Sequence, residues 1–312
     1  MKKIWGYLKQ HLREDFHPGH YGLMAVFLAV SLCLNYTFDY EDSVLDRKQG
    51  FDKIFHFFLL YAVAYYGATL SYLTFSKKLY VLVEPEFWIK SLLGLTVLSL
   101  DSSMPWLRDS INALAHPSVQ YWIYKVCVNM ISFLTIVAPI LIYYRFYEHE
   151  QKNLYGFNAR SFDFKPYFTM LLIMVPLIVG ASFTEGFQRQ YPMYKSSGAH
   201  DYLGVPETVT ASLYEIAYGL DFVTVEYLFR GFLVIGLMSV LGRGAVLSMA
   251  VTYCFLHFGK PLGESISSIF GGFILGVIAY ETKSIWGGVI LHMGIAWMMD
   301  LAAYLQKNVI NP

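Results

Sequence analysis

Long apolar stretches alternate with short polar connections along the whole chain. Ten stretches are apolar enough to form helices in a bilayer: 21–38, 54–75, 86–100, 121–144, 166–184, 207–220, 221–241, 244–258, 266–281 and 284–304. A helix that crosses the hydrocarbon core needs about 20 mostly apolar residues. The 86–100 stretch is short for a crossing, and the run 207–241 is either a partial helix followed by a full one or a single long tilted helix. The pattern predicts an all-α, polytopic membrane helical bundle with about eight transmembrane helices.

The composition supports a multi-pass integral membrane protein. Of the 312 residues, 56% are hydrophobic and only 15% are charged, whereas soluble domains carry about a quarter charged residues. The formal net charge is +0, so no bulk field attracts nucleic acid, and we expect the lipid bilayer to be the chain's surroundings. The three cysteines lie inside apolar stretches and predict no disulfide framework.

Lysine and arginine are unevenly distributed over the connections. They gather before the first stretch and in the second and fourth connections, which predicts a cytoplasmic N-terminus by the positive-inside rule. The polar insertion 145–165 is interpreted as a seam between two parts of the chain. We therefore predict an N-terminal transmembrane region of unknown role, 1–160, and a C-terminal transmembrane region, 161–312, whose functional core spans about 205–304.

Ionisable residues interrupt the apolar stretches of the C-terminal region. Glu226 and Arg230 are four residues apart, so they share one helical face and can form an ion pair. Such groups are costly in a bilayer and usually face a bundle interior or a hydrated cavity. A buried pair that only fixes helix packing is the alternative interpretation for these two residues.

Further polar residues follow on the next stretches. His257 lies at the end of the 244–258 stretch, which Gly259 and Pro261 are expected to terminate, and Glu264 follows in the break. His292 lies in the last stretch, where its neighbours within one turn are small or apolar. We expect Glu226, His257 and His292, which come from three separate helices, to share one polar site.

A glutamate and two histidines are suited to the activation of water. The carboxylate accepts a proton, one imidazole holds or transfers it, and the other stabilises developing oxyanion charge. Two histidines and a carboxylate also form a known zinc ligand set. The chain has no His-Glu-x-x-His spacing, so a site without a metal or other cofactor is favoured.

The order of these residues resembles the CAAX protease and bacteriocin-processing family of intramembrane proteases, also called CPBP or Abi proteins. The resemblance covers about 205–304 and rests on Val225-Glu226-Tyr-Leu-Phe-Arg230-Gly231, Tyr253-x-x-x-His257 and His292-x-x-x-Ala296. It implies a metal-independent glutamate peptidase in a bacterial cytoplasmic membrane. It further implies that His257 assists the base and that His292 stabilises the oxyanion, and that the substrate is a membrane-embedded or lipidated peptide, prenylated or C-terminally tailed.

The chain departs from the family pattern at two positions. Val225 stands where the family has the first glutamate of a Glu-Glu pair, which is usually assigned as the base, and Ala296 stands where it commonly has an asparagine. Either Glu226 takes over as the base, with Glu264 as a second carboxylate, or the chain has kept the fold and lost activity. The predicted function is thus an intramembrane endopeptidase, with Glu226, Arg230, His257, Glu264 and His292 as its catalytic residues. The alternative is a catalytically silent receptor, immunity or scaffold protein, and a proton relay or transporter is a third hypothesis.

Overall fold

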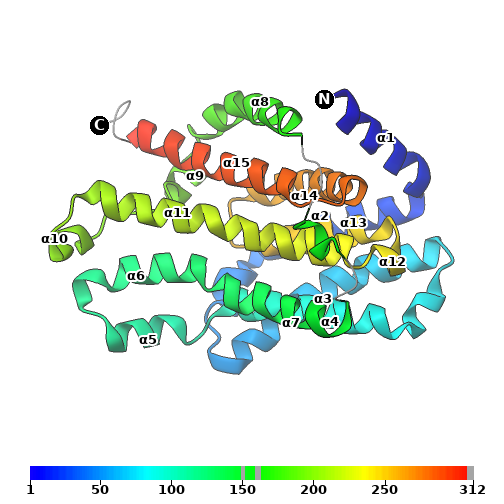
Figure 1. The fold of residues 1–312 in the computed structure, drawn as a ribbon, viewed down its shortest axis with the longest axis horizontal. Helices are drawn as coiled ribbons and strands as arrows, with labels where there is room; N and C mark the ends of the chain where they lie inside the picture. Colours follow the sequence, from blue (N-terminus) through cyan, green and yellow to red (C-terminus); the bar gives the residue numbers. More distant parts are fainter. Residues whose placement is uncertain (149–151, 159–162, 308–312) are drawn as a thin grey trace.

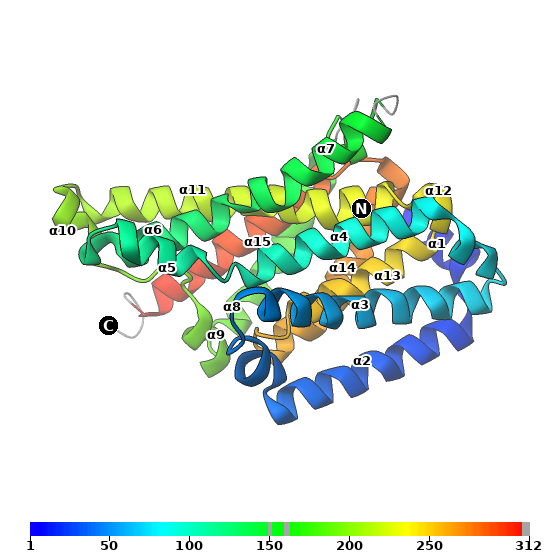
Figure 2. The same cartoon turned by 90° about the horizontal axis from the view of Figure 1, so that it is seen from below.

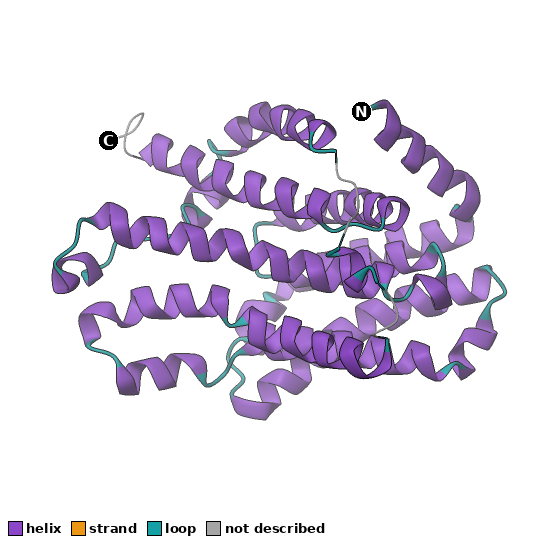
Figure 3. Cartoon of the chain, viewed as in Figure 1, coloured by secondary structure: helices purple, strands orange, loops and turns teal. Residues whose placement is uncertain are grey.

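The computed structural model describes residues 1–148, 152–158 and 163–307. The chain is 83% helical, and the described residues contain no strand, which confirms the predicted all-α class (Figure 3). The α-helices are α1 (Lys2–Asp15), α2 (Pro18–Phe38), α3 (Gly50–Phe75), α4 (Pro85–Ser103), α5 (Leu107–Leu114), α6 (Pro117–Met130), α7 (Ala138–Tyr147), α8 (Lys165–Ala181), α9 (Glu185–Gln190), α10 (Ala199–Leu203), α11 (Glu207–Glu226), α12 (Met238–Leu241), α13 (Gly244–Leu256), α14 (Leu262–Thr282) and α15 (Trp286–Leu305). Shorter 3₁₀- and π-helical segments are η1 (Glu41–Leu45), η2 (Leu79–Val83), η3 (Phe133–Val137), η4 (Leu154–Gly156) and η5 (Tyr227–Ile235).

Within the described residues, six helices are long and apolar enough to cross a membrane. They are Pro18–Phe38, Gly50–Phe75, Pro117–Tyr147, Glu207–Leu241, Leu262–Thr282 and Trp286–Leu305, and Lys165–Ala181 and Gly244–Leu256 are shorter apolar helices. The chain is therefore a polytopic membrane bundle, while eight crossings stay a prediction. The run 207–241 is one helical rod of 35 residues, so the single long helix is the correct alternative. The predicted boundary between 160 and 161 lies outside the described residues.

The long helices run side by side along the longest axis of the molecule (Figures 1 and 2). The rod that begins with α11 packs between α6 and α15, while α13 packs against α3 and α14. Every residue of η5 is buried, and so is every residue of α13 except the last, Leu256. Because both segments are buried among neighbouring helices, they form the centre of the bundle.

Two glycines bring α14 close to α13. A Cβ atom on Gly272 would lie 3.1 Å from the Tyr253 ring, and one on Gly276 would lie 2.7 Å from Met249. The Gly-x-x-x-Gly spacing thus allows close contact between the two helices. The contact fixes the position of Tyr253, which belongs to the site described below.

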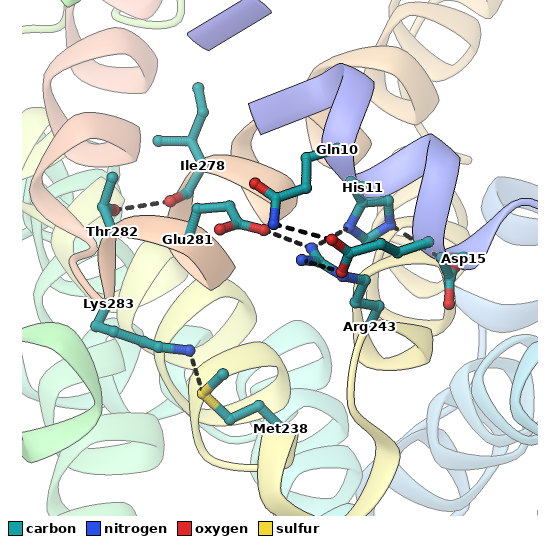
Figure 4. A network of polar contacts seen from close by, with 10 residues as sticks. Gln10, His11, Asp15, Met238, Arg243, Ile278, Glu281, Thr282 and Lys283 are labelled. Carbon is teal, nitrogen blue, oxygen red and sulfur yellow. Dashed lines mark hydrogen bonds and ion pairs between the residues drawn. The ribbon is translucent and has the colours of Figure 1, made fainter. Parts of the chain in front are cut away.

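A charged network attaches α1 to the rest of the bundle. Figure 4 shows Arg243 between His11 of α1 and Glu281 of α14. Arg243 also donates to Glu14 of α1, with 2.7 Å between Nε and Oε2. Burial, assisted by the positive charge of Arg243, lowers the pKa of His11 to about 4, so its imidazole is neutral at pH 7 and can accept from the guanidinium.

Candidate active site

Glu226, Arg230 and His292 meet where α11 and η5 pack against α15. Glu226 and Arg230 are both fully buried, and 2.9 Å separates Glu226 Oε1 from Arg230 Nη1. His292 Nδ1 lies 3.2 Å from the same carboxylate oxygen. The carboxylate therefore holds a cation from its own helix and an imidazole from a neighbouring one.

Gly288 makes room for this carboxylate on α15. A Cβ atom at Gly288 would lie 1.9 Å from Glu226 Oε2, a distance at which two atoms cannot coexist without a shift. Gly288 is one helical turn before His292, so both residues lie on the face of α15 that contacts Glu226. Gly288 leaves the space that the Glu226 carboxylate occupies, and His292 forms a hydrogen bond with that carboxylate.

We expect Gly288→Ala to lower the free energy of unfolding by about 1–3 kcal/mol, because the added methyl group forces the Glu226 carboxylate out of its seat. The matched control is Gly271→Ala on α14, where a Cβ atom would meet nothing within 4 Å; we expect no loss of stability there. Unfolding of both variants in the same detergent micelles measures the difference. Equal stability of the two variants would contradict the claim that the Glu226 carboxylate fills the space left by Gly288.

Tyr253 connects both histidines of the site. Its hydroxyl lies 3.0 Å from His292 Nε2, and its backbone carbonyl lies 2.8 Å from His257 Nδ1. Its ring lies 4.5 Å from the His257 ring and 4.4 Å from the Arg230 guanidinium, measured between centroids and to the guanidinium carbon, respectively. Tyr253 thus joins His257 to the Glu226–Arg230–His292 group.

These contacts assign the imidazole tautomers. A carbonyl oxygen can only accept, so His257 carries its proton on Nδ1 and leaves the lone pair of Nε2 available as a base. Glu226 is a carboxylate paired with Arg230, so it accepts from His292 Nδ1, and His292 Nε2 accepts from the Tyr253 hydroxyl. With both ring nitrogens engaged, His292 as placed here has none free for zinc.

Glu264 lies apart from the ionisable residues of the junction. It is in the first turn of α14, and its Oε2 accepts from the Tyr191 hydroxyl at 3.0 Å. Burial and the neighbouring Glu264 charge raise the pKa of Tyr191, so the phenol stays protonated and donates. Within the described part of the chain, Glu264 makes no hydrogen bond or ion pair with Glu226, Arg230, His257 or His292.

The predicted site residues all lie in one stretch of sequence, and a comparison with known families covers that stretch. Residues 210–298 match the family model of type II CAAX prenyl endopeptidase Rce1-like proteins. The match confirms the predicted resemblance for the last third of the chain and supports an intramembrane endopeptidase fold there. No curated protein and no solved structure matches the chain.

The two departures from the family pattern have different surroundings, since Val225 lies at the end of α11 and Ala296 lies on α15. Val225 lines a cavity of about 240 Å³ together with three acidic residues, Glu41, Asp101 and Asp221. Burial, followed by the nearby Asp46 charge, raises the pKa of Glu41 to about 8, so this cavity holds a carboxyl that is mostly protonated at pH 7. The cavity places carboxyl groups beside Val225, which stands where the CAAX protease and bacteriocin-processing pattern has its first glutamate.

Ala296 is buried in a cluster of aromatic rings. The cluster contains Tyr194, Tyr214, Tyr218 and Phe222, and the Phe222 ring lies 4.3 Å from the His292 ring. No side-chain amide is available at this position, so the Tyr253 hydroxyl is the polar group that binds His292 Nε2.

The sequence did not indicate the linking role of Tyr253 or the bond between Tyr191 and Glu264. Tyr253 is four residues before His257, and that spacing is the one signal for its contact with the imidazole. Tyr191 is 73 residues from Glu264, and no pattern in the sequence relates the two.

Proposed function

We propose that the chain is an intramembrane endopeptidase that hydrolyses a peptide bond in a membrane-embedded or lipidated substrate. The observation that carries the proposal is the junction of Glu226, His292, Tyr253 and His257 within the segment that matches CAAX endopeptidases. These groups combine a base, an oriented donor and a buried carboxylate, which hydrolysis by activated water requires.

His257 acts as the base in this proposal. Its Nε2 takes a proton from a water molecule whose oxygen attacks the scissile carbonyl carbon. The Tyr253 hydroxyl, which donates to His292 Nε2 in the resting site, turns to donate to the carbonyl oxygen as negative charge forms there, and His292 positions the tyrosine. The carbon–nitrogen bond then breaks, and the proton held by His257 passes to the leaving amine.

The carboxylates have supporting roles. Glu226 orients His292 by accepting from its Nδ1, while Arg230 balances the buried charge of Glu226. Because Glu226 is enclosed by Arg230, His292 and Gly288, water reaches it only if one of these groups moves. We propose Glu264, which is partly exposed, as the second carboxylate, on the side of the site that water reaches.

The test uses the full chain in lipid nanodiscs with three membrane peptides. Two share a sequence and differ only in a prenyl group on a cysteine near the C-terminus, and the third carries an apolar C-terminal tail. We expect mass spectrometry to detect a C-terminal fragment from at least one peptide, with no loss on addition of a chelator. Absence of the fragment from all three, or its loss with the chelator, would overturn the proposal.

A catalytically silent CPBP-like scaffold is the second candidate, and Val225 and Ala296 favour it. The double variant Val225→Glu/Ala296→Asn separates the two candidates in the same assay. Cleavage by the double variant alone would assign the native chain to the silent class. Cleavage by the parent chain excludes that class.

We propose the cytoplasmic membrane of a bacterium as the location, with the N-terminus in the cytoplasm. The uneven distribution of lysine and arginine supports this orientation. A cysteine introduced as Lys2→Cys should be protected from a membrane-impermeant thiol reagent in intact cells. Labelling in intact cells would reverse the orientation.

A further inference from the structure

A second cavity, here called the basic pocket, is lined by residues of α5, α6, α9 and the segment that follows α9, and by none of the residues of the Glu226–His292 junction. It has a volume of about 210 Å³. Its polar lining includes four cationic and two phenolic side chains: Arg108, Lys125, Arg189, Lys195, Tyr121 and Tyr124. No carboxylate is among its lining residues, so the charges that face the cavity have one sign.

The cations of the basic pocket are largely unpaired. Arg189 forms an exposed ion pair with Glu185, whereas Arg108, Lys125 and Lys195 form none within the described residues. The Arg108 guanidinium lies 4.5 Å from the centre of the Tyr124 ring, which orients it without neutralising it. Several like charges are thus held together without the counter-charge that usually stabilises such a group.

Lys125 is the most buried of these cations. It is partly buried on α6, and the charges of Lys195, Lys260 and Arg108 act on it. Asp300 is the carboxylate that acts on it most strongly among the described residues, and its two oxygens already accept from the Met193 backbone N–H, each at 3.1 Å. The Lys125 ammonium therefore keeps donors that no group of the described chain takes up.

We propose that the basic pocket binds a phosphate-bearing group. Phosphate carries more than one negative charge and several acceptor oxygens, which matches a guanidinium fork, two ammonium groups and two phenols. Basic pockets between transmembrane helices bind lipid head groups in other membrane proteins. A head group and a free phosphate share this chemistry, and the site does not depend on the proposed peptidase activity.

The test measures binding by the full chain in detergent, using native mass spectrometry. One arm adds inorganic phosphate, a second adds a short-chain phosphatidylglycerol, and a third adds acetate as a singly charged control. Lys125→Gln should weaken phosphate or phosphatidylglycerol binding by about tenfold or more, since a charge-assisted bond is lost. Lys125→Arg should retain binding, and Lys165→Gln, an exposed lysine outside the pocket, should match the parent.

The pattern of binding identifies the source of the phosphate. Binding of both compounds assigns the site to the phosphate group itself, and binding of phosphatidylglycerol alone assigns it to a lipid head group. Equal binding by the parent and Lys125→Gln would overturn the proposal, as would acetate binding as tightly as phosphate. Melting temperatures of the variants without ligand show whether any loss comes from unfolding.

Discussion

Arg230→Met is expected to lower the free energy of unfolding by about 3–5 kcal/mol, because it leaves the Glu226 carboxylate buried without its cation. The double variant Glu226→Leu/Arg230→Met should recover most of that loss, since both charges are removed together and apolar side chains fill the space. Unfolding of the parent, the single variants and the double variant in the same micelles gives the coupling between the two residues.

The matched control for this pair is Arg189, which lies 3.1 Å from Glu185 at the same four-residue spacing. Both partners are more than 80% exposed there, so Arg189→Met should change stability by no more than about 0.5 kcal/mol. A cost for Arg230→Met as small as that for Arg189→Met would contradict the buried pair. It would also weaken the case that Glu226 is held in place for His292.

His257→Gln is expected to reduce the rate of peptide cleavage by about 10²–10⁴-fold, the usual contribution of a positioned general base. Glutamine keeps a donor that can bind the Tyr253 carbonyl, so the fold should be retained while the basic ring nitrogen is lost. Turnover of a cleaved membrane peptide, measured at saturating substrate in nanodiscs, tests the effect.

His200→Gln is the matched control for this variant. Its Nδ1 lies 2.9 Å from the Ser197 carbonyl, the same kind of contact that His257 makes, but it lies on α10 outside the junction. The two substitutions should differ in turnover by the full catalytic factor and only slightly in stability. A similar small loss of turnover in both would remove His257 from the mechanism.

The sequence predicts the elements of the site better than their contacts. Gly259 and Pro261 predict the end of a helix near His257, and the structure has that end at Leu256. The four-residue spacing of Glu226 and Arg230 predicts their shared face, and the ion pair confirms it. Both features are local, so propensity and helical periodicity are sufficient to find them.

Contacts between distant segments could not be predicted in the same way. Periodicity gives the face on which His292 lies but not the helix that this face meets, so its two partners, Glu226 and Tyr253, emerge only from the packing of α11, α13 and α15. Glu264 shares a short segment with His257, yet the turn into α14 directs it to Tyr191. The catalytic roles of the five predicted residues stay predictions until activity is measured.

The central claim is that side chains from separate membrane helices act as one catalytic unit. The most direct test is the turnover of the parent, His257→Gln, His292→Gln and the double variant on one cleaved membrane peptide. Residues that act as a unit are strongly non-additive, so the double variant should be within about tenfold of the slower single variant. A loss of turnover in the double variant equal to the product of the two single losses would contradict the claim.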